Sequence, residues 1–360
     1  MDCIQHNVFL FRTRNPVNPI PKPRATSLVA AYEGAKEVQT QEELDELISD
    51  PDDMRMQALL VRERILGPAH PDTSYYIRYR GAVYADMGYF ERCIALWMYA
   101  LDMQMDKLDP LSPMTQSSLL SFAELFSFMM GGRNRSSNLV RFQDICAIFA
   151  KALAELERGH RVVMNAERPF NERDLNNYSR IITIILHLMS LICSLKSRMT
   201  SEQQFQFKKL VYQLVKLGPR RQDGQTLLHL AANSATTNVG KYPVCEFPCV
   251  NCIELLTEIG VDMDSVDLQG NTALHTACLS EEVNHTIILS LLKAGMHVDT
   301  RNCENKCALD LQSSRRKSLI SQVMPHNFVS LKCLAARVVR QHRVKYRDIP
   351  HELKLFTNKH

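Results

Sequence analysis

The sequence is poor in glycine and aromatic residues, and it has no glycine-rich nucleotide-binding motif. Its 360 residues include 13 Gly and a single Trp, and aromatic residues make up only 7%. We find neither G-x-x-x-x-G-K-[S/T] nor G-x-G-x-x-G, and neither G-x-S-x-G nor H-E-x-x-H. No pair of carboxylates suggests acid–base chemistry either. These absences argue against the nucleotide-dependent, serine-hydrolase and zinc-protease classes, so we predict a protein that is not an enzyme and needs no cofactor.

Neither charge sign dominates. The 43 Lys and Arg against 39 Asp and Glu leave a net charge of +4, too mild to indicate a nucleic-acid-binding protein. We interpret the basic residues near the C-terminus as a solvated face or as a rim for an acidic protein partner, since no aromatic platform accompanies them. They are Arg315 to Lys317, Arg340, Arg343, Lys345 and Arg347.

A secretory signal and a long hydrophobic run are also missing. The first residues, "MDCIQHNVFLFRTRN", lack an apolar core of signal length, and the 11 cysteines are odd in number and irregularly spaced. Both features predict a reducing compartment, the cytoplasm or the nucleus. The longest apolar run, Ile181 to Cys193, contains His187 and Ser190 and is shorter than the roughly 20 residues that a bilayer requires. We predict a buried helix and no membrane partner.

What the sequence does contain is two kinds of repeat. "LGPAHPDTSYYIRYRGAVYADMGYF" begins at Leu66, and a segment with matching Leu, Pro and Thr positions begins 42 residues later, at Leu108. The order Gly81, Tyr84, Gly88, Tyr89, Trp97 and Ala100 resembles a tetratricopeptide repeat, in which small residues let two antiparallel helices approach closely. Arg80 departs from this pattern, because an apolar residue is usual there. Helical periodicity continues to Leu217.

The pattern changes at Gly218 to that of ankyrin repeats. "DGQTLLHLAA", "QGNTALHTAC" and "ENKCALDLQS" begin at Asp223, Gln269 and Glu304, and each resembles the ankyrin opening Gly-x-Thr-x-Leu-His-x-Ala. The wide first spacing places an inserted loop at "SATTNVGKYPVCEFPCV", and the third unit is degraded, as suits a terminal unit. The fold class is therefore all-α, a helical-repeat solenoid.

Two kinds of residue invite a chemical role. We interpret His229 and His275 as structural, because a histidine at this ankyrin position makes hydrogen bonds that join neighbouring units, while Thr226 and Thr272 cap the helices. Three thiols of the inserted loop have a C-x₃-C-x₂-C spacing; we interpret them as incidental cysteines and predict no metal site, with zinc binding as the alternative. They are Cys245, Cys249 and Cys252.

The C-terminal stretch "SLKCLAARVV" (Ser330 to Val339) predicts a short amphipathic helix with Ser330 as its N-cap. One apolar stripe follows the i, i+3, i+4, i+7 spacing, and Val339 extends it. Periodicity alone favours burial of this stripe under the last ankyrin unit. The stripe consists of Leu331, Leu334, Ala335 and Val338.

The same stretch resembles an elongin-binding box, with Ala335 where Cys is usual and Cys333 out of register. "DIPHEL" resembles a cullin-selecting box, with Ile349, Pro350 and Leu353 at its key positions. Helical repeats, ankyrin units and these two boxes occur in the order of the Fem (feminization-protein) family, the substrate receptors of cullin–RING ubiquitin ligases. The family's N-terminal ankyrin array, which reads substrate degrons, has no counterpart here, so no degron-binding residue is assigned.

The resemblance implies a non-catalytic adaptor that promotes ubiquitination and degradation of a target protein. Its partners would be elongin B/C, a cullin with its RING subunit, and a protein substrate. Leu331 would be the anchor side chain in elongin C. The alternative is a repeat scaffold that recruits no ligase. We predict an N-terminal extension and linker with a short helix over residues 1–50, tetratricopeptide-like helices over 51–217, ankyrin repeats over 218–322 and the two boxes over 323–360.

Overall fold

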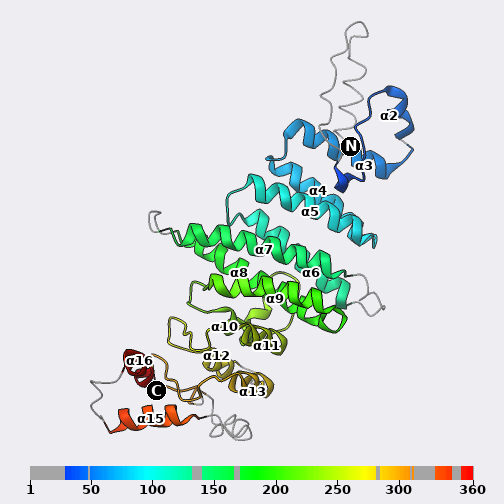
Figure 1. Cartoon of the computed structure of the whole chain (residues 1–360). Helices are drawn as coiled ribbons and strands as arrows, with labels where there is room; N and C mark the ends of the chain where they lie inside the picture. The colour runs from blue at the N-terminus through cyan, green and yellow to red at the C-terminus, as the bar shows by residue number, and fades with distance from the viewer. Residues whose placement is uncertain are drawn as a thin grey trace. The chain divides into compact units, whose positions relative to one another are not determined.

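The computed structural model describes residues 29–47, 49–131, 140–165, 171–280, 284–308, 310–311, 329–342 and 350–359. Every regular element within these ranges is a helix (Figure 1). One isolated bridge pairs Arg301 with Cys307. The all-α helical-repeat fold predicted from the sequence is confirmed. The chain forms two compact units that divide between Ser118 and Leu119. Some predicted features lie outside the described residues, namely residues 1–28, Arg315 to Lys317, Arg343, Lys345, Arg347 and Ile349.

The first unit is a series of helices with well-formed starts. Its described residues form the 3₁₀ turn η1 (Ala30–Tyr32) and four full helices, and α6 (Pro113–Gly131) begins at its end. Asp50 caps α3, because its carboxylate accepts hydrogen bonds from the backbone N–H groups of Asp52 and Asp53. Pro51 and Pro71 occupy first-turn positions, where the missing N–H costs nothing. The four helices are α2 (Gln41–Leu47), α3 (Pro51–Leu66), α4 (Pro71–Asp86) and α5 (Phe90–Lys107).

Helices α4 and α5 form an antiparallel pair, as the tetratricopeptide-like pattern predicts (Figure 1). Gly81 of α4 lies directly against the Trp97 indole of α5, and a Cβ at position 81 would overlap that ring. The indole N–H donates to the carbonyl oxygen of Arg78 at 2.8 Å. Gly81 therefore sets how closely the two helices approach.

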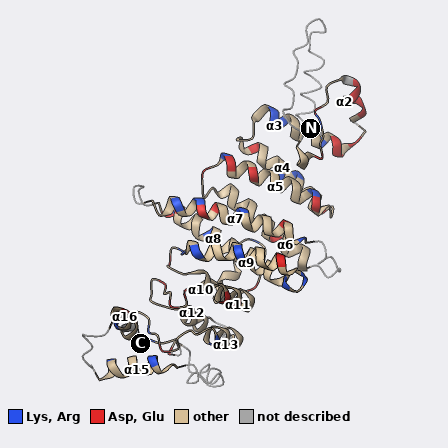
Figure 2. Cartoon of the chain, viewed as in Figure 1, with Lys and Arg blue, Asp and Glu red and all other residues tan. Residues whose placement is uncertain are grey.

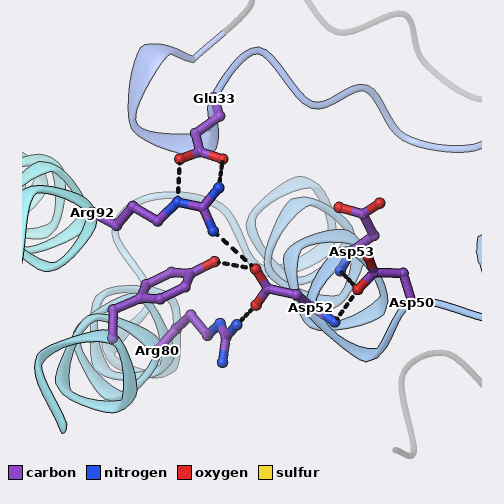
Figure 3. Close-up of polar contacts among 7 residues, drawn as sticks. Glu33, Asp50, Asp52, Asp53, Arg80 and Arg92 are labelled. Carbon is purple, nitrogen blue, oxygen red and sulfur yellow. Dashed lines mark hydrogen bonds and ion pairs between the residues drawn. The ribbon is translucent and has the colours of Figure 1, made fainter. Parts of the chain in front are cut away.

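Arg80, the departure from the repeat pattern, is buried and neutralised. Its guanidinium pairs with the Asp52 carboxylate of α3 and lies over the Tyr84 ring, 4.2 Å from the ring centroid (Figure 3). Asp52 also accepts from the Tyr84 hydroxyl at 2.9 Å and from Arg92 at 3.1 Å, and Arg92 pairs with Glu33 (Figure 3). A buried charge is costly unless it is paired, and this network supplies the pairing.

The second unit starts within α6, and the part of it that the structure describes continues with three long helices and one 3₁₀ turn. Its central helix, α8 (Glu172–Ser194), is packed on several sides. Within the described residues, α8 is the helix long and apolar enough to cross a membrane, and 83% of its most apolar window is buried inside the protein. The predicted burial of the longest apolar run is confirmed from Ile181 to Ile192, and Cys193 at its end is half-buried. The other elements are α7 (Phe142–Val163), η3 (Lys196–Arg198) and α9 (Ser201–Leu217).

The described residues of the ankyrin region form four short helices and one 3₁₀ turn, and two buried histidines join its units. The Nε2–H of His229 donates to the carbonyl oxygen of Asn271 at 2.8 Å, and that of His275 donates to the carbonyl oxygen of Lys306 at 3.2 Å. Each Nδ1 then accepts from the N-cap threonine of its own helix. The structural role predicted for these histidines is confirmed. The elements are α10 (Leu227–Ala231), η4 (Ser234–Thr237), α11 (Val250–Ile259), α12 (Ala273–Leu279) and α13 (His285–Lys293).

The inserted loop joins the ankyrin region to the long helices of the second unit. Ser127 of α6 donates to the carbonyl oxygen of Val244 at 2.7 Å, and the Cys245 thiol donates to the carbonyl oxygen of His187 on α8 at 3.7 Å. The Nε2 of His187 in turn donates to the carbonyl oxygen of Thr236 at 2.8 Å. The insertion therefore packs against the long helices instead of projecting from them.

Candidate functional site

The candidate site is α15 (Leu331–Gln341), followed by α16 (His351–Lys359), which packs against it. Helix α15 begins where the sequence predicts. The Ser330 hydroxyl accepts from the backbone N–H of Cys333 at 3.1 Å, and Ser330 itself has extended backbone angles. The cap fixes the first turn of α15, and so fixes which of its side chains face outward.

The apolar stripe of α15 faces outward. Leu331 is 85% exposed, Val338 51% and Leu334 45%, while Ala335 is exposed and Val339 is half-buried. Burial under the last ankyrin unit, which periodicity alone favours, is therefore wrong for this stripe. A period identifies which residues share a face, but it does not tell which of two faces the rest of the chain covers.

The covered face of α15 carries Cys333 and Ala336, both buried. The Cys333 sulfur lies 3.0 Å from Nδ1 of His297, in the turn that follows α13, and 3.0 Å from the Ser330 hydroxyl oxygen. The box pattern does not predict this contact, because it treats Cys333 only as a residue out of register. In the sequence, Cys333 stands between Leu331 and Leu334 of the outward stripe. Helical spacing turns it to the opposite, covered face, and this is the signal that could have predicted the contact.

Charge on α15 is of one sign. The helix carries Lys332, Arg337 and Arg340 and no acidic residue (Figure 2). The Lys332 ammonium lies 4.1 Å from the centroid of the Phe356 ring on α16, which gives it a cation–π partner. Basic residues thus flank an apolar stripe that is open to a partner.

The predicted cullin-selecting residues lie at the start of α16. Pro350 directly precedes the helix, and its carbonyl oxygen accepts from the backbone N–H of Leu353 at 3.0 Å. The Leu353 side chain is 39% exposed. Ile349 lies outside the described residues, so the structure brings together two of the three residues of this box.

The three loop cysteines lie close to the start of α11 without converging on one point. Cys249 is the N-cap of α11 and Cys252 is buried in its first turn, while Cys245 reaches back to α8. Among the described residues, these three sulfurs do not form a set with all members within 4.8 Å of one another. Incidental cysteines stay the prediction for this loop, with zinc as the alternative. The spacing in the sequence gives no sign of Cys193 of α8, which lies next to Cys252.

The surroundings shift the pKa values of two of these thiols in opposite directions. A hydrogen bond from the Cys252 thiol, another from Ser190 and the backbone N–H groups at the start of α11 lower the pKa of Cys249 to about 6. Burial raises the pKa of Cys245 to about 11. Cys249 is therefore the thiolate of the group near neutral pH.

Comparison with protein families identifies the repeats. A family model described as ankyrin repeats, in three copies, matches residues 201–302. The match begins at Ser201, the first residue of α9, ahead of the boundary at 218 that the sequence patterns predict. Helix α9 packs against α11, as the neighbouring helix of an ankyrin stack does.

Comparison with curated proteins gives relatives along nearly the whole chain. The chain is 48% identical to protein fem-1 homolog C of Xenopus laevis over 97% of its length, and equally identical to the homolog C of Homo sapiens. It is 49% identical to protein fem-1 homolog A of Danio rerio over 95% of its length. It covers 54–55% of these relatives, and so spans about half their length.

Taken with the fold, these similarities are those of a repeat-based adaptor for protein–protein interaction. The order of repeat types that indicates the family in the sequence matches the order of elements in the structure. The chain belongs to the Fem family.

Proposed function

We propose that this chain is a substrate-receptor or adaptor subunit of a cullin–RING ubiquitin ligase, and that α15 docks on elongin B/C. Leu331 is the anchor, with Leu334, Ala335, Val338 and Val339 completing the contact and Ser330 capping the helix. The chain performs no chemistry in this assembly, because the RING partner promotes ubiquitin transfer to the bound protein substrate. The assembly works in the cytoplasm or nucleus.

The observation that carries the proposal is the outward apolar stripe of α15. Leu331, Leu334 and Val338 follow the spacing with which a helix fills a hydrophobic groove, and all three are exposed in the isolated chain. Burial of apolar surface is favourable by roughly 25 cal/mol per Å². Covering this exposed stripe with a hydrophobic groove of a partner would therefore stabilise the complex. The resemblance of "SLKCLAARVV" to an elongin-binding box names that partner.

The second box, in "DIPHEL", is the segment that we propose to contact the cullin. Pro350 and Leu353 lie at the start of α16, which packs on α15 and therefore holds a fixed relation to the elongin-binding stripe. We assign Ile349, Pro350 and Leu353 to cullin selection. The repeats then remain available for the protein substrate, since repeat arrays bind through extended surfaces.

Co-purification with elongins B and C tests the docking role. We expect Leu331→Ala to weaken elongin capture by about 30-fold, because truncation of a central anchor typically costs about 2 kcal/mol or more. Leu279→Ala is the matched control, since it truncates another exposed leucine of the same unit away from α15. Arg337→Ala is a second control, which changes α15 outside the stripe.

Two outcomes would contradict the proposal. Equal recovery of elongins by wild type and Leu331→Ala would mean that the stripe is not the docking surface. No recovery of elongins by the wild-type chain would favour a repeat scaffold that recruits no ligase.

A further inference from the structure

Three side chains with metal-ligating atoms converge where the ankyrin region meets α15. They are His297 and Asp299, in the segment after α13, and Cys333, in the first turn of α15. One ligand atom from each, an imidazole nitrogen, a carboxylate oxygen and a sulfur, lies within 4.8 Å of the other two. Among the described residues, this is the one set of three or more potential ligands that meets that distance.

The ligand types select the metal. A thiolate and an imidazole favour zinc over calcium or magnesium, which take oxygen ligands, and a carboxylate is a common third zinc ligand. Zinc–sulfur and zinc–nitrogen bonds of about 2.3 and 2.0 Å at a tetrahedral angle place the two ligand atoms ~3.5 Å apart. Nδ1 of His297 and the sulfur of Cys333 are 3.0 Å apart, so an outward shift of about half an ångström would admit the ion.

The surroundings hold the side chains of Cys333 and His297 in fixed positions. Cys333 is fully buried, and the Ser330 hydroxyl donates a hydrogen bond to its sulfur at 3.0 Å, which fixes the position of the sulfur. The His297 ring packs edge-on against Phe356 of α16, with centroids 5.3 Å apart, which fixes the direction of the imidazole. The ligands are thus held by three segments of the second unit.

We propose that His297, Asp299 and Cys333 bind one zinc ion, with water in the fourth position. The ion fastens the first turn of α15 to the end of the ankyrin region, on the face opposite Leu331. This inference does not depend on the elongin docking proposed above, because it concerns the covered face of α15 and is tested without any partner.

Metal analysis of the purified full chain is the first test. We expect one zinc per chain in the wild type after dialysis against zinc-free buffer, and loss of that zinc in Cys333→Ser, His297→Gln and Asp299→Asn. Cys303→Ser is the matched control, because it removes an exposed thiol of the same region, and it should retain the zinc. Helical circular dichroism of each variant shows whether the chain still folds, and the near-isosteric Asp299→Asn change keeps the test valid if Cys333→Ser does not fold.

Cobalt substitution distinguishes this site from the loop cysteines. Cobalt at the proposed site gives sulfur-to-cobalt charge-transfer absorption that Cys333→Ser abolishes and Cys249→Ser leaves unchanged. The reverse result, loss with Cys249→Ser and retention with Cys333→Ser, would place the metal in the inserted loop and overturn the proposal. A wild-type chain with no bound zinc would also overturn it, leaving the His297–Cys333 contact as a hydrogen bond without a metal.

Discussion

At the scale of single residues, three buried polar side chains have partners in another repeat element. Arg80 is buried where the repeat pattern expects an apolar side chain, and its partner Asp52 belongs to the preceding helix. His229 and His275 are buried in ankyrin turns, and each donates to the carbonyl of the next unit. Such groups stabilise through their pairing, so removing a partner should cost more than removing the pair.

Asp52→Ala should therefore destabilise the first unit. It leaves the Arg80 guanidinium buried without its carboxylate, and a broken buried pair typically costs about 3–5 kcal/mol; because Asp52 itself is partly exposed, we expect about 2 kcal/mol. Thermal or denaturant unfolding measures the loss. Asp53→Ala is the control, since it removes an exposed carboxylate from the same first turn of α3.

The double variant Asp52→Ala/Arg80→Leu completes the test. An apolar side chain needs no carboxylate, so the double variant should recover part of the stability that Asp52→Ala loses. Equal costs for the two aspartate variants, or no recovery in the double variant, would show that the pairing does not carry the stability.

The buried histidines make stability depend on pH. Burial lowers the pKa of His229 and of His275, so the folded state keeps them neutral where the unfolded chain, with a pKa of about 6.5, takes up protons. The unfolded state then binds more protons as pH falls, and folding stability decreases between about pH 7 and pH 5. His229→Gln should be less stable than wild type at pH 7, with a difference that shrinks at pH 5.

Unfolding curves at the two pH values measure this effect. His351→Gln, at an exposed histidine of α16, is the control and should follow the wild-type pH dependence. A constant difference between wild type and His229→Gln across this range would exclude His229 as a source of the pH dependence.

At the scale of elements, close helix packing is predictable from the sequence and the choice of exposed face is not. Gly81 and Trp97 belong to a known repeat pattern, and the structure has them in contact. The ion pair between Arg80 and Asp52 could not be predicted from the sequence, because the two residues are 28 positions apart and no pattern links them. The exposure of Leu331 is also hidden, since it depends on which side of α15 meets His297.

Gly81→Ala tests the close approach of α4 and α5. The added methyl overlaps the Trp97 ring, so the helices must separate or the indole must move, and overpacking of this kind typically costs about 1–3 kcal/mol. Gly131→Ala adds the same methyl to α6 in open space and should be neutral or slightly stabilising. The midpoint of thermal unfolding compares them, and equal midpoints would mean that the α4–α5 contact tolerates a wider spacing.

At the scale of the whole molecule, the order of repeat types and boxes along the sequence is specific enough to indicate the family, although each motif alone is not. The chain spans about half the length of the relatives it matches. Its two candidate contacts lie on adjacent helices, an apolar stripe on α15 and the start of α16. Two contacts on separate helices should be separable by mutation.

Leu353→Ala should reduce cullin capture while leaving elongin B/C capture intact, because Leu353 lies on α16 and not on the α15 stripe. Leu331→Ala should reduce both, since a cullin bound jointly by α16 and the docked elongins loses one of its two supports. Stepwise pull-down with purified elongins and then a cullin–RING pair measures the two losses, and Glu352→Ala at the neighbouring exposed position is the control. If Leu353→Ala lost elongins as readily as Leu331→Ala, the two helices would form a single contact, and a separate cullin-selecting box at Pro350 and Leu353 would have to be abandoned.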